Sequence, residues 1–140
     1  MLPPRFSPRA PRFNFPARTS RGALAEHMAW YLHLTDEATP TTVGLGEAAP
    51  LAGLSPDFGP EFATAVAQLC ERFNAGAFAT FAAADAPAFV GPGFPSLTFA
   101  LETAAPDLAG GGRRQLYQNA FSRGVAALPI NGLVWMGDAA

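Results

Sequence analysis

The sequence predicts an α+β fold, with a small antiparallel sheet followed by helices and then by one buried strand. Three observations support this prediction. Apolar residues alternate with period two before residue 48, recur at helical spacing between residues 60 and 109, and form a short continuous run near the end. Strands that precede helices are typical of an α+β domain. A continuously apolar strand needs neighbours on both edges, so the last run indicates the start of a further domain.

The composition excludes several classes of function. The chain has 140 residues, of which 49% are hydrophobic, enough for one domain with a core. Only 14% are charged and the formal net charge is -2, so we expect no nucleic-acid partner. We see no run of about 18 apolar residues that would cross a membrane and no secretory leader. We therefore expect a cytoplasmic protein without a membrane partner.

The first elements are predicted to form a three-stranded antiparallel meander. Residues 23–35 alternate, with apolar side chains at even positions, which is the period of a half-buried strand. A turn at residues 36–40 leads to a second strand over residues 41–47. The arginine-rich stretch at residues 12–15 supplies another strand.

A first helix is predicted after Pro60, ending near Gly76, and the loop before it holds Asp57, which favours its N-terminus electrostatically. Cys70 lies on its apolar stripe and is expected to be a buried small hydrophobe. Residues 75–94 are predicted to hold one short helix and a loop. The stripe of the first helix consists of Phe62, Ala65, Val66, Leu69, Cys70 and Phe73.

A second long helix is predicted to open at Pro95, with Ser96 as a plausible N-cap, and to end at the glycines 110–112. Pro106 lies inside this pattern, so we expect a kink or an irregular last turn. The apolar run at residues 128–137 is predicted to be a buried strand.

Several motifs have a plain structural explanation. Gly44 and Gly46 resemble a dinucleotide-binding fingerprint, but no helix starts after them to hold a pyrophosphate. His27 and His33 share strand parity, yet six residues place them roughly 20 Å apart, too far to share one metal ion. Both are expected to be ordinary face residues. Glu102 and Asp107 are likewise expected to be solvated or structural.

The polar turn at residues 19–22 is the strongest candidate for a binding loop. Its glycine permits a tight turn, and its arginine can clamp a carboxylate through two parallel hydrogen bonds. On composition alone, a solvated hairpin turn is the better explanation. A second loop, at residues 51–57, reads on its own as a turn before a helix.

Five segments, taken in order, resemble the o-succinylbenzoate synthase family of the enolase superfamily, and together they cover nearly the whole chain. They are Thr-Ser-Arg-Gly at 19–22, Gly-Leu-Gly-Glu-Ala-Ala-Pro-Leu at 44–51, Gly-Leu-Ser-Pro-Asp at 53–57, Pro-Ser-Leu-Thr-Phe-Ala-Leu-Glu-Thr-Ala at 95–104 and Ile-Asn-Gly-Leu-Val-Trp-Met-Gly at 130–137.

The resemblance implies a capping domain of the enolase N-terminal type, packed over a modified (β/α)8 barrel. It implies dehydration of 2-succinyl-6-hydroxy-2,4-cyclohexadiene-1-carboxylate to o-succinylbenzoate in menaquinone biosynthesis. A barrel lysine would remove the proton, and Mg2+ held by three barrel acids would stabilise the enediolate.

The catalytic groups of that reaction are not expected in this chain. It contains no lysine, and a barrel of this type needs about 250 residues. We therefore expect residues 1–126 to form the capping domain and residues 127–140 to begin a truncated barrel. The chain alone is expected to be inactive, with its own barrel domain as partner and Mg2+ bound there.

The resemblance assigns substrate contact to the two loops, which would close over the barrel mouth and exclude water. Arg21 is expected to contact the anionic cyclohexadiene carboxylate, and the second loop to supply apolar walls and backbone contacts. Arg18 departs from the small residue expected at its position and would compete for the anion. The candidate substrate-binding residues are Thr19, Ser20, Arg21, Gly22, Leu51, Gly53, Leu54 and Ser55.

Two alternatives remain open from the sequence. The same superfamily includes N-acylamino acid racemases and dipeptide epimerases, which share the capping fold. The second alternative is a standalone, non-catalytic binding module. Its exposed apolar residues after residue 129 would favour aggregation.

Overall fold

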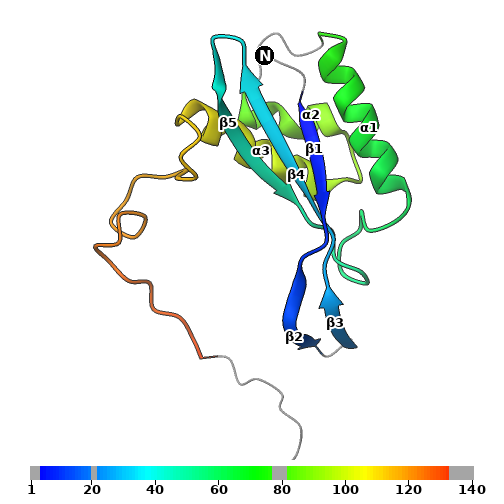
Figure 1. The fold of residues 1–140 in the computed structure, drawn as a ribbon, viewed down its shortest axis with the longest axis vertical. Coiled ribbons are helices and arrows are strands. Elements are labelled where there is room, and N and C mark those ends of the chain that lie inside the picture. The colour runs from blue at the N-terminus through cyan, green and yellow to red at the C-terminus, as the bar shows by residue number, and fades with distance from the viewer. Residues whose placement is uncertain (1–3, 20–21, 77–81, 133–140) are drawn as a thin grey trace, which may run out of the picture.

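The computed structural model describes residues 4–19, 22–76 and 82–132, without the side chains of residues 18 and 19 (Figure 1). A sheet with helices against one face forms the body, and residues 113–132 lead away from it. The elements in chain order are β1 (Arg5–Arg9), β2 (Arg12–Thr19), β3 (Gly22–Glu26), β4 (Ala29–Asp36), β5 (Thr39–Ala48), α1 (Glu61–Asn74), the 3-10 helix η1 (Ala83–Asp85), α2 (Ala86–Val90) and α3 (Pro95–Ala109).

A three-stranded antiparallel sheet is confirmed, in the order β1-β4-β5. The strand predicted at residues 12–15 is present within β2 but is not part of this sheet, and β1 takes the place expected for it. The strands β2 and β3 pair separately, as a hairpin that extends beyond the sheet and that we call the arm (Figure 1). Because β2 follows β1 and β3 leads into β4, the sheet edge and the arm are two parts of one long hairpin. It is interrupted at residues 10–11 and 27–28.

Two details of the strand prediction were wrong. The strand expected over residues 23–35 is divided into β3 and β4, because the chain leaves the ladder at His27 and Met28. The strand β1 was not predicted, since Pro8 interrupts its pattern. Pro8 lies opposite Trp30 on an edge strand, where a residue without an N–H is tolerated.

The helices close the core against the even-numbered face of β4, where Leu32 and Leu34 are fully buried. The predicted first helix is confirmed as α1, with Phe62, Val66, Leu69 and Phe73 buried as its stripe requires. The rings of Trp30, Phe62 and Phe94 pack in tilted contacts, with centroids 6.1 and 6.4 Å apart. Hydrophobic burial of these side chains is the main stabilising contribution of this layer.

Cys70 is only half-buried, so the expectation of a fully buried thiol was too strong. Its Sγ lies 3.8 Å from the carbonyl oxygen of Pro4. Burial, followed by the negative charge of Glu71, raises the pKa of the Cys70 thiol. A raised pKa favours the neutral thiol over the reactive thiolate.

The helix α3 lies unusually close to β5 because two glycines face it. A Cβ on Gly46 would overlap the carbonyl oxygen of Ala100, and a Cβ on Gly44 would overlap that of Ala104. Four helical residues rise about 6 Å and two strand residues about 7 Å. The distance between Ala100 and Ala104 along α3 therefore matches the distance between Gly46 and Gly44 along β5. Gly44 and Gly46 thus serve helix–sheet packing inside a strand, which explains their spacing without a nucleotide.

Asp107 is buried and joins three parts of the chain. Its Oδ2 accepts the N–H of Leu45 at 2.9 Å, and its Oδ1 accepts the N–H of Arg114 at 2.7 Å. The Arg114 guanidinium also pairs with this carboxylate and donates to the Val43 carbonyl oxygen at 2.7 Å. These bonds hold Arg114 at φ 62°, in the left-handed region. The structural role expected of Asp107 is confirmed.

The ends of α3 differ in part from the prediction. The N-cap is Phe94, so Pro95 and Ser96 are the first helical residues and Ser96 is not the cap. The helix continues through Pro106 to Ala109, and Gly110 then donates its N–H to the Pro106 carbonyl oxygen at 2.8 Å. The predicted end at the glycines is confirmed.

The short helix predicted between α1 and α3 is confirmed within the described residues as η1 and α2. The predicted buried strand at residues 128–137 is wrong for residues 128–132, which form no strand and are exposed. Leu128 is 58% and Ile130 89% exposed, because no other strand of the described chain lies beside them. Residues 133–137 lie outside the described residues. In the part of the chain that the structure describes, no helix is both long and apolar enough to cross a bilayer.

Substitution of Gly46 by alanine should destabilise the protein by about 2 kcal/mol or more, because the added methyl group collides with rigid helix backbone. Urea unfolding would measure the loss. Gly59→Ala is the matched control: its Cβ would meet only the flexible end of Glu61, so its effect should stay within about 0.5 kcal/mol. Equal effects of the two substitutions would contradict the close approach.

The pH dependence of stability should report on Asp107. Burial by itself raises the pKa of Asp107, but the N–H groups of Leu45 and Arg114 and the Arg114 guanidinium outweigh it and lower the pKa below its ordinary 3.8. The stabilisation is therefore present above that value and is lost as the pH falls through the lower, folded-state pKa. Asp107→Asn should reduce the free energy of unfolding by about 2 kcal/mol at pH 7.

Urea unfolding at a series of pH values checks this prediction. The wild-type and Asp107→Asn curves should converge as the pH falls through the lowered, folded-state pKa of Asp107, where the carboxyl group becomes protonated in both states. Glu102→Gln, an exposed substitution on the same helix, should leave the pH profile unchanged. A constant difference between wild type and Asp107→Asn down to pH 2 would rule out the ionised carboxylate as the source.

Candidate functional site

The first predicted binding loop is the tip of the arm. β2 ends at Thr19 and β3 begins at Gly22, which has φ 126°, a conformation that favours glycine. The hairpin turn expected there is thus confirmed at its two ends. Ser20 and Arg21 lie outside the described residues, so the assignment of Arg21 to the substrate stays a prediction. No side-chain position is described for Thr19 either.

The second predicted loop, residues 51–55, is closed by its own hydrogen bonds. The N–H groups of Leu54 and Ser55 donate to the Leu51 carbonyl oxygen at 3.1 and 2.9 Å. The Ser55 hydroxyl accepts the Leu51 N–H at 2.8 Å, and Gly53 has φ 73°. Leu54 is 58% exposed at the surface of this turn. An apolar side chain is therefore presented outward on a loop closed by its own hydrogen bonds, and its assignment to an apolar wall stays a prediction.

The two loops belong to the same end of the molecule. Figure 1 shows that the arm extends from the end of the sheet at which β5 finishes, and the 51–55 loop follows β5. A hydrogen bond between described residues joins the two regions: Nε2 of His27, at the base of the arm, lies 3.3 Å from the carbonyl oxygen of Pro50. The structure thus brings the base of the first loop against the start of the second.

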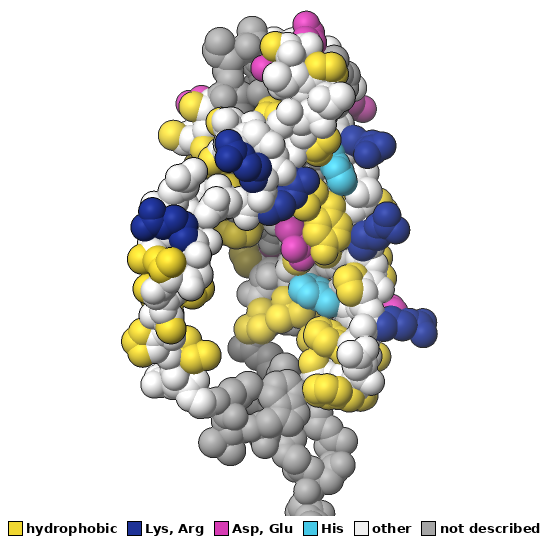
Figure 2. Space-filling view, turned by 60° about the vertical axis from the view of Figure 1, so that its left-hand side comes forward, with side chains coloured by type: hydrophobic (Ala, Val, Ile, Leu, Met, Phe, Trp, Pro, Cys, Tyr) yellow, Lys and Arg dark blue, Asp and Glu magenta, His cyan; other side chains and the backbone are white. Residues whose placement is uncertain are grey.

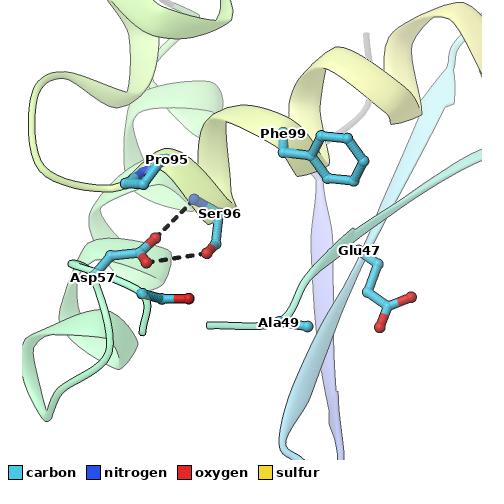
Figure 3. A pocket seen from close by; sticks show the side chains of 7 residues that line it. Glu47, Ala49, Asp57, Pro95, Ser96 and Phe99 are labelled. Carbon is cyan, nitrogen blue, oxygen red and sulfur yellow. Dashed lines mark hydrogen bonds between the residues drawn. The ribbon is translucent and has the colours of Figure 1, made fainter. Parts of the chain in front are cut away.

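Asp57 holds the second loop to α3. Its Oδ2 accepts the Ser96 N–H at 2.7 Å and its Oδ1 accepts the Ser96 hydroxyl at 3.1 Å (Figure 3). Asp57 is 5% exposed. A carboxylate at a helix N-terminus also interacts favourably with the helix dipole. This effect was predicted for the first helix, but the carboxylate lies at the start of α3, and α1 has no side-chain cap.

An open cavity of about 500 Å3 lies beside this bond. In Figure 3, Asp57 faces Ser96 while Glu47 and Phe99 lie on the other side of the opening. The two carboxylates make the cavity a poor site for an anion, and Asp57 already uses both oxygens. Among the predicted site residues whose side chains the structure describes, only Ser55 contributes to it. The lining consists of Glu47, Ala49, Ser55, Asp57, Pro95, Ser96 and Phe99.

Sequence reasoning assigned no functional site to Glu47, Ser96 and Phe99. No local pattern would have placed them together, because Ser96 reaches Asp57 across 39 positions of sequence. The motif segments at residues 53–57 and 95–104 each contain one partner of the bond. Both segments are among those that carry the family resemblance, and this was the one indication in the sequence that they belong to a common site.

The histidines occupy different surroundings. Burial lowers the pKa of His33, and the positive charges of Arg5, Arg114 and Arg9 lower it further. Its Nε2 lies 2.9 Å from the Ser7 hydroxyl, across β1 and β4. Both histidines are visible on one face in Figure 2, one of them beside arginine side chains. Each has a hydrogen-bonding partner within the fold, in keeping with the ordinary role expected of face residues.

No group of three or more histidine, cysteine or acidic side chains comes together within residues 4–19, 22–76 and 82–132. Three acidic ligands are the set that the resemblance implies for Mg2+. The described residues therefore do not fit a magnesium site.

Asp57→Ala should lower the free energy of unfolding by about 1–2 kcal/mol, because Ser96 loses its partner at the start of α3. Asp85→Ala is the matched control, since the exposed Asp85 caps only the short η1 through the N–H of Ala82. The control should cost less than about 0.5 kcal/mol in the same urea titration. Equal losses would show that Asp57 is no more than a local cap.

No family model matches the chain. A curated o-succinylbenzoate synthase from Desulfotalea psychrophila is 32% identical to it over 152 aligned positions. The alignment includes 91% of this chain and 40% of the relative, so the chain spans about two-fifths of the relative's length.

The chain also superposes on part of a solved structure. The crystal structure of MenC from Desulfotalea psychrophila superposes with a TM-score of 0.59 and 26% sequence identity, covering 98% of this chain and 43% of that one. The resemblance and the α+β fold expected of it are therefore confirmed: over nearly its whole length, the chain is similar to part of an o-succinylbenzoate synthase.

Proposed function

We propose that this chain is the capping domain of an o-succinylbenzoate synthase, with residues 1–126 forming the cap and residues 127–140 the start of the barrel domain. The observation that carries the proposal is the match of 91% of the chain to only 40% of a curated o-succinylbenzoate synthase. The fold supports it, because the superposition on the MenC structure covers 98% of this chain and only 43% of that one.

In this role the chain shapes and closes the substrate pocket. The arm and the loop at residues 51–55 lie at the same end of the fold. In this role the turn at residues 19–22 and that loop would cover the barrel mouth. Arg21 would bind a carboxylate of the cyclohexadiene substrate in a bidentate pair. The exposed Leu54 would form part of an apolar wall, and closure of both loops would exclude water.

The chemical step belongs to the barrel domain in this proposal. A lysine base and Mg2+ bound there would supply proton abstraction and charge stabilisation for the dehydration that yields o-succinylbenzoate in menaquinone biosynthesis. This chain has no lysine, and its described residues offer no site for the ion. The chain alone should thus be inactive, and its contribution is binding and orientation.

A chimera tests the proposal. Residues 1–126 replace the matching segment of the Desulfotalea psychrophila synthase, and o-succinylbenzoate formation is followed with Mg2+ present. The chimera should form product while the 140-residue chain alone does not. Arg21→Ala in the chimera should lower kcat/KM roughly 10- to 100-fold, the loss expected for a charged hydrogen-bonded pair.

Arg12→Ala is the matched control on the same arm. Arg12 pairs with Glu26 at 3.5 Å, with both side chains largely exposed, so its removal should change kcat/KM less than about threefold. A folded chimera that forms no o-succinylbenzoate would contradict the proposed function. Equal effects of Arg21→Ala and Arg12→Ala would contradict the assignment of Arg21.

A further inference from the structure

The arm has little support from the body of the protein. It forms its own two-stranded sheet, and its register shifts between Arg12 and Ala17. Phe13 is 45% and Phe15 66% exposed, so these aromatic side chains do not anchor it in the core. An isolated two-stranded hairpin is marginally stable in water. The direction of the arm must therefore be set at its base.

His27 occupies that base, between the end of β3 and the start of β4. Its N–H donates to the Pro11 carbonyl oxygen at 3.1 Å, which closes the hairpin across the interruption. Its Nε2 lies 3.3 Å from the Pro50 carbonyl oxygen. A carbonyl oxygen only accepts, so the imidazole must carry its proton on Nε2 and donate it.

The acceptor, the Pro50 carbonyl oxygen, is placed so that a movement of His27 reaches the 51–55 loop. Pro50 is buried and precedes the 51–55 loop directly. The loop is stiffened by the bonds of Leu54 and Ser55 to the Leu51 carbonyl oxygen, and Asp57 fixes its far end to Ser96. A displacement of Pro50 therefore shifts the loop as a unit.

We propose that His27 is a positioning residue that ties the arm to the 51–55 loop through its Nε2–H···O=C bond to Pro50. The consequence for substrate rests on the proposed function, in which the two loops cover one pocket. The imidazole fixes the angle between them, so that the arm tip and the loop move together.

Hydrogen exchange of the 140-residue chain, read by mass spectrometry, tests the tie. In His27→Leu, the amides of residues 22–26 and of residues 51–55 should both exchange roughly three- to tenfold faster, in keeping with the loss of one hydrogen bond. Amides in the middle of α1 should keep their wild-type rates. In the control His33→Leu, which breaks only the contact with Ser7 across β1 and β4, the arm and the loop should keep theirs.

Acceleration of the arm without the loop, or of neither, would overturn the proposal. Uniform acceleration that includes α1 would also count against it, because His27 would then stabilise the whole fold and not this connection. Nitrogen NMR of 15N-histidine in the wild-type chain gives an independent check that needs no variant. A neutral His27 ring with its proton on Nδ1 would exclude the bond. These measurements require no catalytic turnover. The proposed role of His27 can therefore be contradicted while the chimera still forms o-succinylbenzoate, and it can hold while the chimera is inactive.

Discussion

The close approach of α3 to β5 is the constraint on which the rest of the structure depends. Two strand glycines remove the side chains that would keep helix and sheet at their usual separation, and Ala100 and Ala104 occupy the space. The shorter distance lets Asp107 reach the Leu45 N–H from the helix side. Packing and hydrogen bonding thus support each other, since a wider spacing would leave the buried carboxylate without this partner.

The same packing fixes the candidate site. Once α3 is held on β5, its first residues lie beside the chain that leaves β5, and Asp57 can bind Ser96. The 51–55 loop is therefore anchored to the core at one end through Asp57 and contacts His27 near the other through Pro50. A loop placed in this way presents Leu54 outward without losing its conformation. Rigid support of exposed residues is what a substrate-contacting loop needs.

The sequence allowed the prediction of elements whose residues carry a local signal. Phe62, Val66, Leu69 and Phe73 defined α1, and the alternation around Leu32 and Leu34 defined β4. Bonds between distant segments had no such signal. The Asp107–Leu45 bond spans 62 positions, and the division of the long hairpin at His27 depends on its bond to Pro11 across the strands. Residue chemistry made the turn at residues 19–22 a candidate for binding, but the assignment of both loops to the substrate depends on the resemblance, because short polar turns look alike in any hairpin.

The matched spacing of Gly44 and Gly46 with Ala104 and Ala100 has an evolutionary consequence. One inserted or deleted residue between the glycines would turn one of them to the other face of the sheet and bring a side chain against the helix backbone. The same change between the alanines would rotate one of them by about 100° around the helix axis. Descendants of this chain can therefore carry substitutions in β5 and α3. They cannot gain or lose a residue between the two glycines or between the two alanines without disrupting this packing. The strands β2 and β3 of the arm form a sheet of their own, so a change in their length would leave this contact between β5 and α3 in register.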